Sequence, residues 1–221
     1  MATGITSVLV GISFRKAFRI LDDTGAIFDK LLYEDGGKYF SPKYFPRIEY
    51  GGFEKGLRND ETGNYLKLTS DNVVYCHNIP KTADEDREIK AVIERVNKAI
   101  VPFLLETYRL EISRVGMVFT VEVDGKKLSK FKSKYFKDNV DVSAFRFSIP
   151  SATPAGIKEK DTKDYYNTIY TISKDGDKFV ISFDFQEYFK PLKPSWRECR
   201  ADTFFAKARQ EFANNLANEL E

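Results

Sequence analysis

The chain has 221 residues, of which 42% are hydrophobic and 14% aromatic, so it holds enough apolar material for a packed core. This excludes a disordered protein, because disorder needs low hydrophobicity combined with high net charge. The 35 basic and 33 acidic residues leave a formal net charge of +2, which gives no global electrostatic signature for nucleic acid or a membrane surface. The sequence shows no secretion signal and no apolar stretch approaching the roughly 20 residues that span a bilayer. We therefore expect a cytoplasmic protein outside the membrane.

The first predicted elements are a strand and a helix. Apolar residues alternate with other residues near the start of the chain, and we expect the alternation to resume beyond residue 17; the apolar positions are Val8, Val10, Ile12, Phe14, Phe18 and Ile20. A helix follows, with two alternative starts. Asp22 or Asp23 can cap a helix with an apolar face over residues 27–32. A longer helix from Ala17 also fits the 3.6-residue period, although Gly25 disfavours it.

Three strands are predicted next, over residues 47–55, 63–69 and 72–77, after a loop rich in glycine and proline. The helix that follows has the strongest pattern in the chain. Thr82 and Glu85 form a capping box, in which each side chain satisfies a free backbone donor of the first turn. One apolar stripe then continues to Pro102, which we expect to kink or end the helix. The stripe consists of Ile89, Val92, Ile93, Val96, Ile100, Phe103 and Leu104.

The second half of the chain repeats this order. Alternating apolar residues predict a strand over 115–123, and Asp124-Gly125 predicts a turn before a short helix over 126–136. A strand near 142–149 and a long proline-containing loop from Pro150 follow. Strands over 164–173 and 177–187 are joined by a hairpin at Asp175-Gly176. A second capping box at Ser195 introduces a closing helix, whose apolar positions are Phe205, Ala208, Phe212, Leu216 and Leu220.

The repeated order has a counterpart in the residues themselves. Residues 10–14, Val-Gly-Ile-Ser-Phe, return as Val-Gly-Met-Val-Phe at 115–119, and the same spacing separates residues 65–75 from a similar stretch at 170–180. Self-similarity at a fixed long spacing indicates an internal structural repeat. We therefore predict an α+β fold of two pseudo-repeats, residues 1–108 and 109–221, with one shared core. Each reads strand, helix, three strands, helix, and together they form one antiparallel sheet with helices on one face.

Catalytic and metal-binding patterns are few, and we expect no cofactor and no metal. His77 is the only histidine, which argues against a histidine-bearing metal cluster, and we interpret it as a surface residue at a strand end. Cys76 and Cys199 form no C-x-x-C pair and are expected to be buried, reduced thiols. The glycines at residues 51–56 lack the Lys-Ser/Thr of a phosphate loop. Asp124 and Lys126 are spaced as in restriction-type nucleases, but a turn explains them.

A cluster of lysines and aromatic residues marks the predicted helix at 126–136. Lysines neutralise phosphates and aromatic rings stack on exposed bases, so the mixture suits an anionic partner such as single-stranded nucleic acid. The alternative is a solvated helix whose aromatic residues face the core. The candidate anion-binding residues are Lys126, Lys127, Lys130, Lys134, Lys137 and Tyr135.

The strand patterns also predict the character of the sheet face turned away from the helices. If Phe179, Ile181, Phe183 and Phe185 face the helices, the residues between them face outward, as do alternate residues of the strand at 115–123. The expected face is polar and partly acidic, which disfavours phosphates and suits a protein partner. Its predicted members are Thr120, Glu122, Asp124, Ser182, Asp184 and Gln186.

Two resemblances support this architecture. The strand Ser113-Arg114-Val115-Gly116-Met117-Val118-Phe119 follows an apolar helix and resembles a strand of the form R-[VI]-G-L-R-[YF] in an uncharacterised prokaryotic family. Val118 stands where that family has its second arginine, so no role of that arginine carries over. The strand at 180–185 and the closing helix with Phe212 also look similar. The order of elements is similar to the two-copy topology of the TATA-box-binding protein, without its sequence motifs.

The first functional hypothesis is a non-enzymatic protein-interaction, sensor or accessory module of a bacterial system; phage defence is a context suggested only by the sporadic character of the resembling family. The alternative is a nucleic-acid-binding protein that uses the lysine helix. A third is a carrier of a small apolar ligand in the aromatic-rich space between sheet and helices. We expect a protein partner first, with nucleic acid and homodimer formation left open.

Overall fold

Nine strands form one antiparallel sheet in a computed structural model that describes residues 4–45, 47–51, 54–135, 144–150, 164–175 and 178–217. Their order across the sheet is β2-β3-β4-β5-β1-β6-β9-β8-β7. The strands are β1 (Ile5–Phe14), β2 (Arg47–Gly51), β3 (Glu54–Arg58), β4 (Tyr65–Leu68), β5 (Asn72–Asn78), β6 (Ile112–Val123), β7 (Ala144–Pro150), β8 (Tyr165–Asp175) and β9 (Lys178–Lys193).

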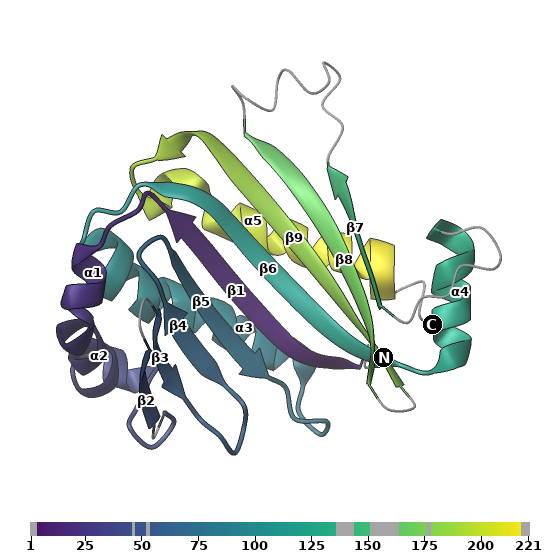
Figure 1. Cartoon of the computed structure of the whole chain (residues 1–221), viewed down its shortest axis with the longest axis horizontal. Helices are drawn as coiled ribbons and strands as arrows, with labels where there is room; N and C mark the ends of the chain where they lie inside the picture. The colour runs from purple at the N-terminus through teal and green to yellow at the C-terminus, as the bar shows by residue number, and fades with distance from the viewer. Residues whose placement is uncertain are drawn as a thin grey trace.

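Helices from both halves of the chain lie on one face of this sheet. Figure 1 shows α3 and α5 behind the strands, with α1 and α2 near the β2 edge and α4 beyond one end of β6. The fold is thus α+β, with an antiparallel sheet and helices packed on one face, as predicted. The helical segments are α1 (Arg19–Asp22), α2 (Thr24–Tyr33), η1 (Asp35–Lys38), α3 (Glu85–Arg95), η2 (Val96–Glu106), α4 (Gly125–Tyr135), η4 (Trp196–Cys199), α5 (Ala201–Phe212) and η5 (Ala213–Ala217).

The two pseudo-repeats meet along β1 and β6, which pair antiparallel at the centre of the sheet. Gly11 pairs with Gly116, the residue at the same position of the other repeat. β5 flanks β1 on one side and β9 flanks β6 on the other, so the arrangement is nearly symmetric about the glycine pair. The second half follows the predicted order. The first half has one strand more, because residues 47–55 reverse direction after Gly51 and form β2 and β3.

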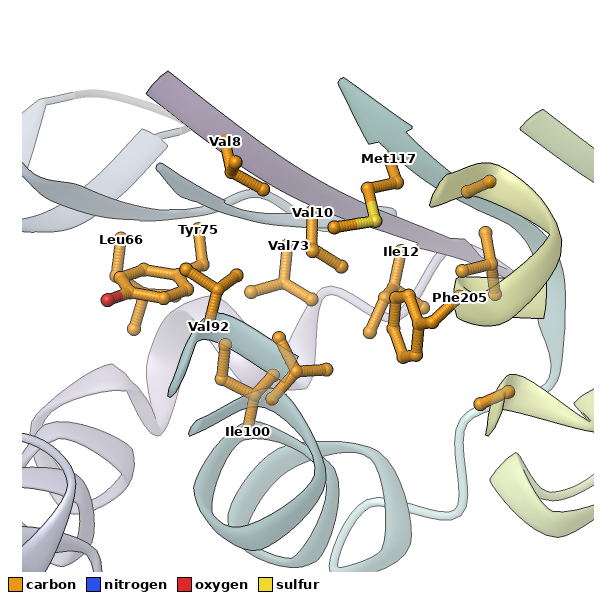
Figure 2. Packing of buried hydrophobic residues seen from close by; sticks show 14 of the residues in the cluster. Val8, Val10, Ile12, Leu66, Val73, Tyr75, Val92, Ile100, Met117 and Phe205 are labelled. Carbon is orange, nitrogen blue, oxygen red and sulfur yellow. The ribbon is translucent and has the colours of Figure 1, made fainter. Parts of the chain in front are cut away.

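One hydrophobic core joins both halves. From Val8 onward, every second residue of β1 faces the helices and is almost fully buried, which is the period of two that the sequence showed. Figure 2 shows these side chains converging with Val92 and Ile100 from the long helix that α3 and η2 form together, and with Phe205 from α5. The strand residues labelled there are Val8, Val10, Ile12, Leu66, Val73, Tyr75 and Met117.

Several predicted helix boundaries were wrong, each for a local reason. Asp84, not Thr82, caps α3, because its extended backbone lets its carboxylate accept from the backbone N–H groups of Asp86 and Arg87. Glu85 instead accepts from the backbone N–H groups of Gly4 and Ile5, at 3.0 and 3.2 Å, and so ties the helix to β1. Of the two outcomes expected at Pro102, a kink or an end, the end is wrong, because the helix continues as π-helical turns from Val96 to Glu106.

Other element boundaries also differ from those that the sequence predicted. The alternation of β1 does not resume, since Phe18 is 57% exposed and Ile20 lies in α1, which breaks at Asp23 before α2. Asp124 connects β6 to α4 as predicted, but α4 already begins at Gly125, and Asp124 caps it by accepting from the backbone N–H groups of Lys126 and Lys127. The predicted closing helix is split, because the left-handed backbone of Arg200 separates η4 from α5.

Candidate binding surface on the open face of the sheet

The sheet face opposite α3 and α5 carries no helix among the elements that the structure describes, and Figure 1 looks onto it. We call it the open face. The strand register places five residues in one row across its middle, one from each of five neighbouring strands. The row consists of Val74 (β5), Gly11 (β1), Gly116 (β6), Gln186 (β9) and Asn167 (β8).

Backbone angles do not require either glycine at the centre of this row, and a Cβ atom fits at both, with Gly11 partly exposed and Gly116 buried beside Asp184 and Gln186. Neither is among the described glycines with a positive φ angle. A Cβ atom built on Gly11 would lie 3.9 Å from its nearest neighbour, and one on Gly116 would lie 3.6 Å from Asp184 Oδ1, both ordinary contacts. Glycine inside a strand costs about 0.5–1 kcal/mol relative to alanine. Strand glycines without a packing reason mark places where a ligand or another backbone approaches closely.

A chain of hydrogen bonds runs beside the glycine pair. Arg114 donates through Nη2 to Ser13 Oγ, at 2.9 Å, and makes a longer 3.4 Å contact through Nη1 with Tyr188 Oη. Tyr188 in turn donates to Gln186 Oε1, at 2.7 Å, and Gln186 Nε2 donates to Asp184 Oδ2, at 2.6 Å. These side chains are therefore held in fixed orientations from β1 to β9 before any partner binds.

Neighbouring side chains also cover the aromatic ring of Tyr188. It stacks on Tyr165, with ring centres 4.8 Å apart and planes within 3°. The Arg114 guanidinium lies 5.6 Å from the Tyr188 ring centre. Because neighbouring side chains occupy the Tyr188 ring, it offers little surface for stacking a nucleic-acid base.

Asp184 is a half-buried acid within this polar chain. Burial raises the pKa of its carboxyl group from the ordinary value of 3.8 to about 6, although the hydrogen bond from Gln186 and the charges of Arg114 and Arg146 act in the opposite direction. Among the described residues it forms no ion pair. Its Oδ1 atom lies next to Gly116, on the open side of the sheet.

The open face carries the polar and acidic residues that were predicted, and the strand register adds apolar ones, Leu9, Val74, Val118 and Ile169. Thr120, Glu122, Ser182, Asp184 and Gln186 all lie on it. The strand register also places cationic residues there that the sequence interpretation left out, namely Lys67, Arg114 and Arg146. The exposed Glu122 is paired with Lys178, at 2.8 Å.

The predicted lysine helix is present as α4. Lys126 and Lys127 are exposed at its N-terminal end, and Leu128 is buried. Lys130, Lys134 and Tyr135 lie on the same helix, but their side chains are outside what the structure describes, and Lys137 and Leu220 lie outside the described residues altogether. The helix is distant in the sheet register from the glycine pair, so the structure does not join the two candidate sites.

His77 is not a surface residue, which corrects the sequence interpretation. It is a residue of β5 and is 5% exposed; its Nε2 contacts Glu88 Oε2 of α3 at 2.7 Å and its Nδ1 contacts Tyr44 Oη at 2.9 Å. Burial lowers the pKa of His77 despite the neighbouring Glu88 carboxylate. These contacts fit a neutral ring that donates through Nε2 and accepts through Nδ1. Sequence reasoning missed it because Tyr44 and Glu88 come from distant segments.

The space that a small apolar ligand would need is also present. A cavity of about 650 Å³ lies between α3 and α5, with Ile5, Ile89, Phe119 and Phe212 among its lining residues. Arg209 contacts Asp86 across it.

Cys76 and Cys199 are both buried and unpaired, and burial raises the pKa of each thiol. Within the described ranges, no three His, Cys, Asp or Glu side chains are grouped so that they could hold a metal ion. None of the described helices has the length and apolar character needed to cross a membrane.

Comparisons with known proteins identify no family. The chain matches no protein-family model and no curated protein sequence. Among solved structures it is similar to the di-domain ARO/CYC StfQ from the steffimycin biosynthetic pathway, at 9% sequence identity over 96% of this chain and 93% of that one, with a TM-score of 0.22. A TM-score this low supports no inference about the function of this chain.

Proposed function

We propose that this protein is a non-enzymatic cytoplasmic module that binds a partner protein through the open face of its sheet. The observation that carries the proposal is the Gly11–Gly116 pair, because a Cβ atom at either position would make only ordinary contacts, and alanine is the more stable residue inside a strand. A close approach by a partner backbone gives these two glycines a function. The bacterial and phage-defence contexts remain expectations from the sequence.

The chemistry of the open face suits a protein segment better than nucleic acid. Its charged residues are of both signs, with the cations Lys67, Arg114 and Arg146 and the acids Asp184 and Glu122 on the same face. Amide and hydroxyl groups of β8 and β9 supply both donors and acceptors. Mixed polar groups of this kind pair with the backbone and side chains of a protein, whereas a nucleic-acid site would need a cationic surface with free aromatic faces.

The test is to add a methyl group where the partner would lie. Gly11→Ala and Gly116→Ala should fold with unchanged or slightly higher stability, yet should fail to retain the protein that copurifies with the natural chain from its host. Gly25→Ala is the matched control, because Gly25 lies in α2 with open space around its Cβ position. Retention of the same partner by both sheet variants would refute the open face as the binding surface.

Nucleic-acid binding by α4 is a second candidate, favoured by the position of two lysines. Lys126 and Lys127 lie in the first turn, directly after the Asp124 cap. The helix dipole makes this end partly positive, so lysines there cost stability, whereas glutamates would add to it. An anionic partner gives a reason for lysines at these positions.

A matched pair of measurements tests this second candidate. Replacing Lys126 and Lys127 by glutamate should raise the melting temperature slightly and abolish salt-sensitive binding to single-stranded DNA. The control is Lys67→Glu on the open face, which should leave any such DNA binding in place. Equal DNA binding by the natural chain and by the double variant would remove α4 as the site.

A further inference from the structure

A hollow of about 930 Å³ opens beside Arg114, where the ends of β1, β6 and β9 meet. Its polar lining includes Ser13, Arg114 and Tyr188 together with the Arg15–Glu111 ion pair and Lys190, and Pro191 and Leu192 contribute apolar surface. It adjoins the glycine pair, because Arg114 and Ser13 are each two residues from a glycine on the same strand and the same face. A segment lying over the glycines can therefore continue into this hollow.

Arg114 differs in its partners from the neighbouring Arg15 and from Arg47 and Arg58 at the β2 edge of the sheet. Arg15 pairs with Glu111 at 2.5 Å, and Arg47 and Arg58 both pair with Asp60. Among the described residues, no carboxylate lies within ion-pair distance of Arg114, whose hydrogen bonds go to two neutral hydroxyl groups.

The neighbouring acid does not neutralise this charge. The Asp184 carboxylate is separated from Arg114 by Gln186, whose amide bonds to both Asp184 and Tyr188. The charge of Arg114 lowers the pKa of Asp184, but by less than burial raises it, so the two charges compensate each other only in part. The guanidinium is thus a half-buried cation, oriented by Ser13 and Tyr188, with N–H groups left over for an anion.

We propose that Arg114 binds an acidic side chain of the partner segment, while an adjacent apolar residue of that segment packs against Pro191 and Leu192 in the hollow. This inference rests on the proposed protein-binding function and names the chemistry that the open face selects. An arginine held in a fixed orientation suits a carboxylate, because the planar guanidinium can donate two parallel hydrogen bonds to it. The apolar wall adds selectivity for the neighbouring residue.

Selection from a phage-displayed library of random peptides tests the chemistry without knowledge of the partner. The full chain should enrich peptides with Asp or Glu next to an aliphatic residue. Arg114→Gln should lose that preference, whereas Arg146→Gln, an arginine on the same face, should keep it. In a synthetic copy of an enriched peptide, Asp→Asn should weaken binding to the natural chain about tenfold and leave binding to Arg114→Gln unchanged.

Different negative results would overturn the role of Arg114 alone or the open face as the binding surface. Enriched peptides that carry no acid, or that bind Arg114→Gln as well, would overturn the role of Arg114 while leaving the open face as a peptide-binding surface. Peptides whose binding is unaffected by both Arg114→Gln and Gly116→Ala would place the site elsewhere and overturn both. Enrichment of no peptide at all would also count against both.

Discussion

The half-buried carboxyl group of Asp184 lowers the free energy of unfolding when it is charged. Its pKa is raised to about 6 in the folded protein, mainly by burial, from an ordinary value of 3.8. Between these values the folded chain binds more protons than the unfolded chain, so the free energy of unfolding falls as the pH rises from about 4 to about 6. Above pH 6 the penalty is constant, at about 3 kcal/mol for a shift of about two pKa units.

Replacing Asp184 by asparagine removes the charge that burial disfavours. We expect the free energy of unfolding to rise by about 1–3 kcal/mol at pH 7.5 and to change little at pH 4, where the natural residue is already largely protonated. Urea unfolding at the two pH values measures both differences. Glu122→Gln is the control, because Glu122 is exposed and paired with Lys178, and it should bring no gain at pH 7.5. An equal gain at both pH values would contradict the argument.

The hydroxyl group of Tyr44 organises the buried polar cluster around His77. It contacts His77 Nδ1 at 2.9 Å and accepts a hydrogen bond from Asn64 Nδ2 at 2.9 Å. Tyr44→Phe leaves both groups without this partner inside the protein, so we expect a loss of about 1–3 kcal/mol in the free energy of unfolding. Chemical denaturation measures it, with Tyr33→Phe as the control because Tyr33 is 67% exposed. A loss no larger than that of Tyr33→Phe would show that water replaces the hydroxyl.

At the scale of the elements, periodic patterns predicted most of the fold. β1, β6 and β9 bury alternate residues, and the stripe of α3 contains the buried Ile89 and Val92. Helix ends were harder, because the choice among neighbouring polar residues depends on backbone angles. Thr82 and Asp84 both suit a cap, and only the extended backbone of Asp84 decides between them.

The residues of the open face were predicted only in part, because their neighbours on adjacent strands cannot be read from local patterns. Strand alternation placed Asp184 and Gln186 outward, but the neighbours across the sheet depend on register, which joins Arg114 to Tyr188 and Gly11 to Gly116. The repeat itself was a usable signal, since it made the two glycines equivalent. Their direct pairing follows only from the antiparallel arrangement of the two halves.

The start of α3 gives a direct test of one corrected boundary. Asp84→Ala should lower the free energy of unfolding by about 0.5–2 kcal/mol, because the backbone N–H groups of Asp86 and Arg87 lose their acceptor. Thr82→Ala is the matched control and should have an effect within about 0.5 kcal/mol. Thermal or urea unfolding distinguishes the two variants. A larger loss for Thr82→Ala would restore the capping box that the sequence predicted.

At the scale of the whole molecule, the two pseudo-repeats share one sheet and one core, so they are not separate domains. β1 and β6 pair along most of their lengths, and the buried residues of both halves form one cluster. The indole Nε1 of Trp196, in the second half, donates to Asn97 Oδ1 in the first, at 3.0 Å. Separating the halves would expose two central strand edges and the apolar residues behind them.

We therefore expect one cooperative unfolding transition for the entire chain. Trp196 is the only tryptophan, so its fluorescence follows the second half, whereas far-ultraviolet circular dichroism follows both. The two signals should give the same urea midpoint and slope, as a two-state transition requires. Asn97→Ala, which removes the partner of the indole from the other half, should shift both midpoints together. A circular dichroism transition with two steps, only one of which coincides with the fluorescence change, would show that the repeats unfold independently and that the β1–β6 pairing does not couple them.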